Sequence, residues 1–154
     1  GITVFENPGA LPRFRFVDEA VGVPDFAAAQ QLWAAGFDAS KAAMVEGISG
    51  RTKLAAGRIL AQQVGNSSLA FRVETEGRAL LVVADTWFPG WTATVDGKPL
   101  PIAVVNGCMR GVFVESAGEH QVTMRFWPWS LTAGLVITAL GLIALVSLCR
   151  TGRG

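Results

Sequence analysis

The chain contains little charge, and this shortage limits the partners that it can have. Charged residues make up 16% of the 154 residues, whereas about a quarter is usual in a soluble domain. The formal net charge is only +1, so the protein has no basic field that would attract nucleic acid. We therefore expect no nucleic-acid partner.

Cysteine and histidine are also scarce, which limits metal and nucleophilic chemistry. Cys108 falls in a predicted loop and Cys149 at the end of an apolar run, so we expect neither a disulfide nor a metal site. His120 has no second histidine and no positioned nucleophile beside it. A hydrogen-bonded residue at a hairpin corner is favoured over an acid–base or ligand role. We expect no catalytic residue, metal or cofactor in this chain.

A run without charge lies near the C-terminus, from residue 130 to residue 149. At about 1.5 Å per residue, a helix of this length spans roughly 30 Å, the thickness of a hydrocarbon core. A charge at mid-depth would cost about 2.5–3.5 kcal/mol, so its absence is expected of a spanning helix. A buried core helix is the alternative, but core helices rarely lack a polar stripe over this length. The run predicts one C-terminal transmembrane helix over residues 128–149.

The residues that flank the run predict its orientation. Trp127 and Trp129 precede it, where indoles favour the membrane interface. Arg150 and Arg153 follow it, as the positive-inside bias predicts. We therefore expect residues 1–127 to form a domain outside the cytoplasmic membrane, and a short tail after the helix to be cytoplasmic.

Small side chains form one stripe of the predicted helix, at Gly134, Thr138 and Gly141. Such a stripe allows close packing against another transmembrane helix, but it also matches ordinary membrane composition. Residues 150–154 are the predicted cytoplasmic tail. The lipid bilayer is one expected partner, and other transmembrane helices are a second.

The region before the uncharged run has the pattern of β-strands. Leu69, Phe71 and Val73 alternate with less apolar residues, so one face of this segment is apolar. Residues 79–84 are continuously apolar, as in a central strand that is buried on both faces. Turn signals separate short strands along the whole region. We expect a mainly β fold, either an antiparallel β-sandwich-like structure or a curled sheet.

One short amphipathic helix is predicted near the N-terminus, over residues 25–35. Asp25 can cap its first turn, and Ala29 and Trp33 lie on one helical face. Gly36 is a plausible C-terminal stop.

An aromatic segment lies in the middle of the β region, where residues 87–99 read Trp-Phe-Pro-Gly-Trp-Thr-Ala-Thr-Val-Asp-Gly-Lys-Pro. This segment resembles the aromatic-Pro-Gly-Trp-x-Ala-x-Val-Asp-Gly signature near the C-terminus of bacterial YfhO-like membrane proteins. Other motifs are similar in the same order: Glu-Asn-Pro-Gly-Ala-Leu-Pro-Arg at 6–13, Asn106 with Arg110-Gly111-Val112, and Ala-Gly-Glu-His-Gln-Val at 117–122. The motif residues that we expect to be structural are Pro89, Gly90, Trp91, Asp96, Gly97, Gly111, Gly118 and His120.

The resemblance implies a place for this chain in a larger protein. YfhO-like proteins are polytopic and related to the GT-C glycosyltransferases, which use lipid-linked sugars outside the cytoplasmic membrane. The many preceding helices, and the early loop in which GT-C enzymes place a catalytic acidic residue, are absent here. The chain begins with Gly1 and not with Met, which also suggests a fragment. The resemblance therefore implies a non-catalytic, extracytoplasmic C-terminal domain of a protein that glycosylates the cell envelope.

The aromatic segment supplies the candidate binding residues. Trp87 and Phe88 offer flat apolar faces on which a sugar ring can pack. Asp85 and Asn106 could accept hydrogen bonds from its hydroxyls, and Arg110 could meet a lipid-linked phosphate, although a plain surface arginine is the simpler interpretation. The expected ligand is a lipid-linked sugar or an envelope glycan.

Two alternatives to glycan binding stay open. Asp85 and Asp96 flank the Pro-Gly-Trp element and could form a carboxylate pair for glycosyl chemistry. A turn role is favoured for both, because Asp96 precedes Gly97 and Asp85 ends a strand. The second functional hypothesis is a structural or assembly module that docks on a partner membrane protein through the C-terminal helix.

Overall fold

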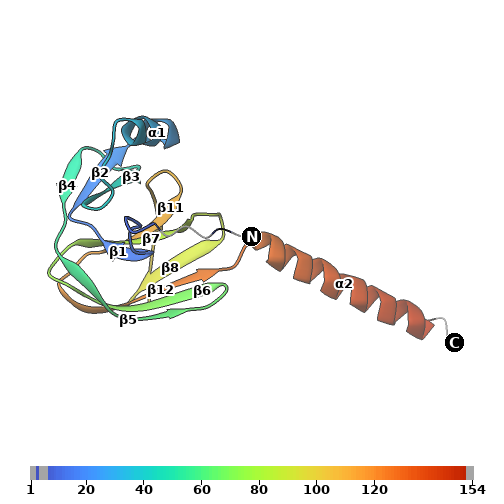
Figure 1. The fold of residues 1–154 in the computed structure, drawn as a ribbon. Helices are drawn as coiled ribbons and strands as arrows, with labels where there is room; N and C mark the ends of the chain where they lie inside the picture. The colour runs from blue at the N-terminus through green and yellow to red at the C-terminus, as the bar shows by residue number, and fades with distance from the viewer. Residues whose placement is uncertain (1–2, 4–6, 152–154) are drawn as a thin grey trace.

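Short strands follow one another from residue 14 to residue 126, and a helix follows them. The computed structural model describes residue 3 and residues 7–151 of the chain. The elements in chain order are β1 (Phe14–Phe16), β2 (Glu19–Val23), α1 (Phe26–Ala34), β3 (Ala42–Glu46), β4 (Arg51–Lys53), β5 (Gly57–Val64), β6 (Ser68–Thr75), β7 (Ala79–Thr86), β8 (Trp91–Val95), β9 (Lys98–Leu100), β10 (Ala103–Val105), β11 (Met109–Val114), β12 (Gly118–Phe126) and α2 (Trp129–Thr151). The strands make a β body from which α2 extends (Figure 1).

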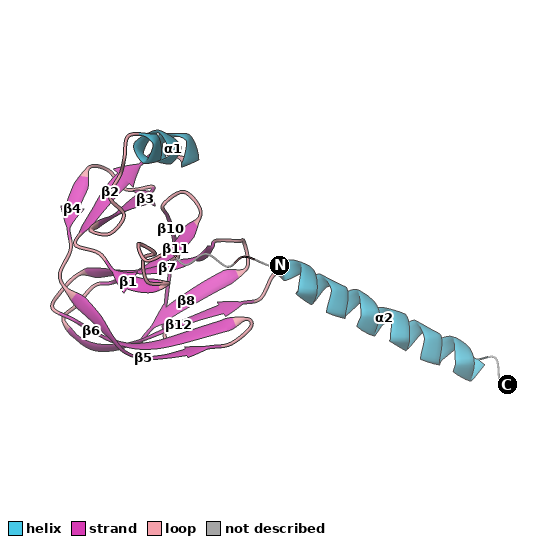
Figure 2. Cartoon of the chain, in the orientation of Figure 1, coloured by secondary structure: helices cyan, strands magenta, loops and turns pink. Residues whose placement is uncertain are grey.

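The strands of the β body form two sheets. One sheet has the order β1-β7-β11-β10-β3-β2-β4 and the other has the order β5-β6-β12-β8-β9. Neighbouring strands are antiparallel except for β2 and β3, which are parallel. The helix α1 lies in the connection between β2 and β3, and loops or turns make the other connections (Figure 2). The expectation of a mainly β fold is confirmed.

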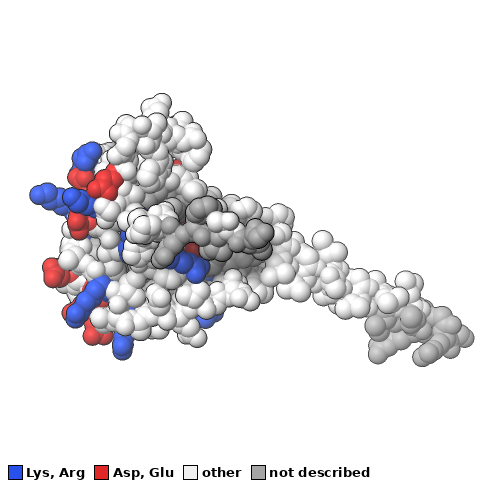
Figure 3. Space-filling view, in the orientation of Figure 1, with Lys and Arg blue, Asp and Glu red and all other residues white. Residues whose placement is uncertain are grey.

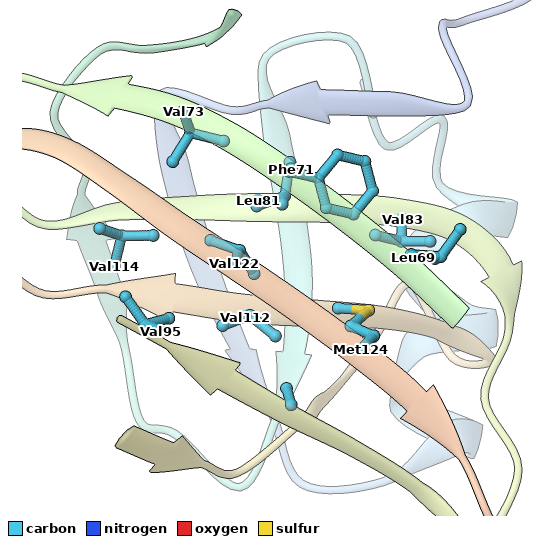
Figure 4. Packing of buried hydrophobic residues seen from close by; sticks show 11 residues of the cluster. Leu69, Phe71, Val73, Leu81, Val83, Val95, Val112, Val114, Val122 and Met124 are labelled. Carbon is cyan, nitrogen blue, oxygen red and sulfur yellow. The ribbon is translucent and has the colours of Figure 1, made fainter. Parts of the chain in front are cut away.

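Alternating side chains join the two sheets into one core. The strands β6, β7, β8, β11 and β12 direct every second residue toward the opposite sheet, which follows from the period of two in a β-strand. The buried residues of this core, seen in Figure 4, are Leu69, Phe71, Val73, Leu81, Val83, Ala93, Val95, Val112, Val114, Val122 and Met124. Burial of a Val, Leu, Phe or Met side chain stabilises the fold by about 1.5–3 kcal/mol.

The strand β7 is buried on both faces, as its continuous apolar run predicts. Leu81 and Val83 face the second sheet, whereas Leu80 and Val82 belong to a second cluster on the other side of β7. That second cluster also contains Val45. The seven-stranded sheet thus has apolar contacts on both faces.

The helix α1 agrees with the predicted helix over 25–35. The Asp25 carboxylate accepts a hydrogen bond of 2.9 Å from the Ala28 amide, which caps the first turn. Ala29 is buried against Val23 and Met44. The helix therefore packs on β2 and β3 of the seven-stranded sheet.

The prediction of a transmembrane helix over 128–149 is wrong. In the described part of the chain, no helix has both the length and the apolar character that crossing a membrane requires. The sequence argument counted missing charges, but hydroxyl and glycine residues interrupt the run. Thr138 and Ser147 direct their hydroxyls to the carbonyl oxygens of Gly134 and Ile143, each at 2.9 Å.

Parts of two further predictions fall outside the described residues. Residues 152–154 of the predicted cytoplasmic tail are not described, nor is Glu6 at the start of the first family-like motif. The side of the membrane on which the β body lies stays a prediction.

Candidate functional site

The Pro89-Gly90 turn joins β7 to β8 and lies where the β body meets α2. The Trp127 amide donates to the Gly90 carbonyl oxygen at 2.8 Å, and the Trp87 amide donates to the Cys108 carbonyl oxygen at 2.7 Å. Gly90 has a φ of +113°, and a Cβ there would lie 2.9 Å from the Pro128 Cα. Only glycine fits this close approach without strain. The turn is therefore held on both sides.

Two aromatic side chains next to this turn face outward, and we call Trp87 and Phe88 the aromatic shelf. Their exposed fractions are 36% and 60%. The Phe88 ring packs edge-on against Phe126, with centroids 6.3 Å apart, and Phe126 in turn packs against Trp91 at 5.4 Å. The shelf thus rests on partly buried rings and not on a free loop.

A group of charged side chains lies beneath Trp91, and we call Arg13, Asp85, Arg110 and Trp91 the Asp85 cluster. Arg13 donates from Nε and Nη2 to the two Asp85 oxygens, at 2.8 and 2.9 Å. Arg110 donates from its own Nη2 to the same carboxylate at 2.7 Å. The Arg110 guanidinium carbon lies 3.7 Å from the centroid of the Trp91 ring. A carboxylate, two guanidinium groups and an indole are therefore packed together.

The Asp85 cluster differs in burial from one member to the next. The side chain of Arg110 is 3% exposed, that of Asp85 is 21% exposed and that of Arg13 is 52% exposed. The hydrogen bonds from Arg13, with the positive charges of Arg13 and Arg110, hold the pKa of the Asp85 carboxyl below its usual value despite partial burial. Burial lowers the pKa of Arg110, and Asp85 opposes this shift. Asp85 is thus an ionised structural partner and not a proton donor.

The structure brings together four of the five predicted binding residues. Trp87 and Phe88 are exposed, while Asp85 and Arg110 lie under the same corner of the body. Asn106 lies elsewhere: it is 4% exposed, and its Oδ1 accepts from the Met44 amide at 2.9 Å. Its φ of +54° suits the turn between β10 and β11. The side-chain oxygen of Asn106 is therefore already bonded to the backbone of β3.

The other end of the β body holds the histidine. His120 Nδ1 lies 2.7 Å from Asp96 Oδ2, and the Gln121 amide donates to Asp96 Oδ1 at 2.8 Å. These two bonds, first from His120 and then from Gln121, lower the pKa of Asp96. Asp96 and Gly97 form the turn between β8 and β9, and Gly118 begins β12 after the turn that follows β11. One histidine therefore joins two turns.

Ser116, His120 and Asp96 have the order of a Ser–His–Asp triad, but their geometry does not support nucleophilic catalysis. His120 Nε2 lies 3.3 Å from Ser116 Oγ and 3.0 Å from the Ser116 carbonyl oxygen. The Nε2 atom lies closer to the carbonyl oxygen than to the hydroxyl, so the ring is not directed at the hydroxyl as a general base would be. The His120 side chain is also only 11% exposed. The arrangement is that of a hydrogen-bonded corner.

Asp85 and Asp96 do not form a catalytic pair. The strand β8 (Trp91–Val95) runs from the Asp85 cluster to the turn that contains Asp96. At about 3.3 Å per residue, this strand separates the two ends by roughly 16 Å. Glycosidase carboxylates are about 5–9.5 Å apart. Among residues 3 and 7–151, no three acidic, histidine or cysteine side chains gather as metal ligands.

Sequence reasoning missed Arg13, which is 72 positions from its partner Asp85. Only the pairing of β1 with β7, which places Phe14 opposite Val83, brings the two together. The position of Arg13 at the end of the first family-like motif was the one signal in the sequence. Gly111 of the same set of motifs lies against Val105, where a Cβ would come within 2.5 Å of the Val105 side chain.

Comparison with known proteins connects this geometry to a family. The sequence model of the family described as bacterial membrane protein YfhO matches residues 51–138, more than half of the chain. The match includes the aromatic shelf, the Asp85 and Arg110 pair and the Asp96 and His120 pair, and it leaves Arg13 outside. No curated protein and no solved structure matches the chain. The chain belongs to the YfhO family of bacterial membrane proteins, and that membership implies an association with a membrane.

Proposed function

We propose that this chain is the non-catalytic, extracytoplasmic C-terminal domain of a membrane protein that takes part in cell-envelope glycosylation. In this proposal the domain contacts glycan or acceptor through the aromatic shelf. The observation that carries the proposal is that two exposed aromatic rings are presented on a turn that is held in place from both sides. The link to glycosylation comes from the resemblance to YfhO-like proteins.

The chemistry of the shelf supports contact with a sugar. An aromatic ring offers an apolar face, and a sugar presents C–H groups on one side of its ring and hydroxyls at its edge. The ring of Phe88 is the more exposed of the two. Because the Phe88 ring packs against Phe126, which packs in turn against Trp91, little conformational freedom of Phe88 is lost when a ligand binds.

Arg13 is the group that we propose for contact with a lipid-linked phosphate. Arg110 is covered by Trp91 and bonded to Asp85, so a phosphate cannot reach it without a rearrangement. The Arg13 side chain is half exposed and binds the carboxylate of Asp85. Asp85 precedes Trp87 of the shelf by two residues. Arginine suits this role because its planar fork matches phosphate oxygens.

A double substitution of the shelf tests the proposal. Trp87→Ala with Phe88→Ala should weaken binding to soluble envelope oligosaccharides by about tenfold or more, as expected when stacking surface is lost. Isothermal titration of the full chain measures the affinity, and Val64→Ala, which removes an exposed apolar side chain from β5, is the control. Equal affinity of the folded double variant and the parent would remove the recognition role.

A second candidate function is that of an assembly module. Apolar side chains of α2 are exposed in the structure, among them Leu135, Ile137 and Ile143 at 54%, 69% and 63%. A Cβ added at Gly134 or Gly141 would meet no atom within 4 Å. In this alternative α2 docks on a partner membrane protein. Specific crosslinks from cysteines at 134 and 141 to one partner would favour it.

A further inference from the structure

A polar groove lies on the outer face of the five-stranded sheet, away from the aromatic shelf. It has a volume of about 520 Å³, which falls within the range of about 300–1,000 Å³ that is usual for small-molecule sites. Its lining includes Ala61, Gln63, Ala70, Arg72 and Gln121. These residues come from β5, β6 and β12, three neighbouring strands of one sheet.

The register of these strands explains why the surface is hollow there. In one row across the sheet, Gln121 lies opposite Arg72, and Arg72 lies opposite Ala61. In the next row on the same face, Ala70 lies opposite Gln63. Successive outward residues on one strand alternate with buried ones. The two alanines therefore leave a depression between long polar side chains.

Three polar side chains around the depression have no protein partner among the described residues, whereas Asp96 and His120 at its end bind each other. No hydrogen bond or ion pair involves the side chains of Arg72, Gln63 or Gln121 in the parts of the chain that the structure describes. The adjacent polar groups of the same face behave differently, because Arg58 pairs with Glu74. Donors and acceptors are thus left uncommitted at the groove and engaged beside it.

The mixture of charges indicates what the groove can bind. Arg72 contributes one positive charge, and Asp96 and Glu119 at one end of the groove contribute two negative charges. An anion such as phosphate would meet the two carboxylates, and a cation would meet the guanidinium. Amide and charged side chains together suit a neutral ligand whose hydroxyls both donate and accept. The alanine floor suits the C–H face of a sugar ring.

We propose that this groove binds a neutral saccharide of one or two sugar units, with Arg72 and Gln121 as the principal hydrogen-bonding residues. This site is independent of the aromatic shelf and requires no catalytic role of the chain. The ligand lies along β6 and β12 with its ring over Ala70. The groove is wide and open on one side, so the expected dissociation constant is in the millimolar range.

Backbone amide shifts of the full chain test this site. A panel of neutral disaccharides, namely maltose, cellobiose and lactose, is titrated against the ¹⁵N-labelled protein. At least one should shift the amides of residues 61–63, 70–72 and 119–121 in a saturable way. Absence of saturable shifts at these positions with every sugar would overturn the proposal. So would saturable shifts at the same positions with inorganic phosphate alone.

Substitutions separate groove binding from general effects. Arg72→Ala and Ala70→Leu should each weaken binding by about tenfold, the first by loss of donors and the second by filling the floor. Arg125→Ala is the matched control, since Arg125 also lies on the outer face of β12 but outside the groove. An equal loss of affinity in Arg125→Ala and Arg72→Ala would contradict the assignment. The shelf variant Trp87→Ala with Phe88→Ala should keep these shifts, so failure of the shelf and failure of the groove are distinguishable.

Discussion

The two ends of the β body each hold a carboxylate between turns, but at different depths. At the end next to α2, Asp85 accepts from two arginines, and one of them, Arg110, is 3% exposed. At the opposite end, Asp96 is 48% exposed and binds a single histidine. A charge that is buried away from water needs an oppositely charged partner to be tolerated in the fold. An exposed ion pair contributes only about 0–1 kcal/mol to stability. The comparison teaches that the stability of the fold depends strongly on the carboxylate at the end near α2 and only weakly on the carboxylate at the opposite end.

The two ends also differ in what surrounds them. In Figure 3 the charged side chains lie on the β body, and the described surface of α2 that faces the viewer carries none. The Asp85 cluster lies below aromatic residues, and the Asp96 turn lies at one end of the polar groove. One end therefore presents aromatic rings above ion pairs, and the other presents polar side chains around an open groove.

The largest expected effect is that of Asp85→Ala. This change leaves the Arg110 guanidinium buried without an acidic partner, which should destabilise the fold by about 3–5 kcal/mol. Denaturant unfolding measures the loss, and Asp96→Ala at the opposite end should cost clearly less. Equal losses for the two variants would contradict the difference in depth.

Substitution of the turn glycines should give an intermediate effect. Gly90→Ala combines a φ of +113° with a contact of 2.9 Å to the Pro128 backbone, whereas Gly97→Ala has a φ of +78° and open space around it. Backbone strain of this kind costs about 1–3 kcal/mol. We expect Gly90→Ala to lower the melting temperature more than Gly97→Ala does, as measured by calorimetry. A larger loss in Gly97→Ala would show that the turn near α2 can relax.

The smallest expected effect is a change in acid sensitivity at the exposed end. The pKa of Asp96 is lower in the folded protein, so its contribution to stability is fully present above its unfolded pKa of about 3.9. That contribution is lost as the pH falls through the folded pKa. As the pH falls from 7 through the folded pKa of Asp96, the Asp96→Asn variant should therefore lose less free energy of unfolding than the parent protein. Denaturant midpoints measured over this pH range test the difference. Superimposable profiles would mean that the bond to His120 contributes nothing.

Local patterns were sufficient to predict β6, β7, the turn at Asp96-Gly97 and α1. The alternation of Leu69, Phe71 and Val73 predicts their burial, and Asp96-Gly97 predicts a turn, because both signals depend on neighbouring residues alone. The Asp85 cluster was not predictable in this way. Asp85 lies on β7, Arg110 on β11 and Trp91 on β8, and Arg13 directly precedes β1. Only the pairing of distant strands brings these four residues together.

Two errors of interpretation have physical causes. Asn106 resembled a surface acceptor, but its oxygen binds a backbone amide across the sheet, a contact that sequence spacing does not reveal. The C-terminal run was judged by its lack of charge, whereas passage through a membrane depends on sustained apolarity. A segment can lack charged residues without being apolar enough to cross a membrane.

The short connection between β12 and α2 has a mechanical consequence. Only Trp127 and Pro128 separate Phe126 from Trp129, and the Trp127 amide is bonded to Gly90 in the turn beside Phe88. Such a linker leaves little room for hinge motion, so the helix axis and the shelf rotate as a unit. Whatever holds α2 thereby sets the height and the tilt of the two exposed rings.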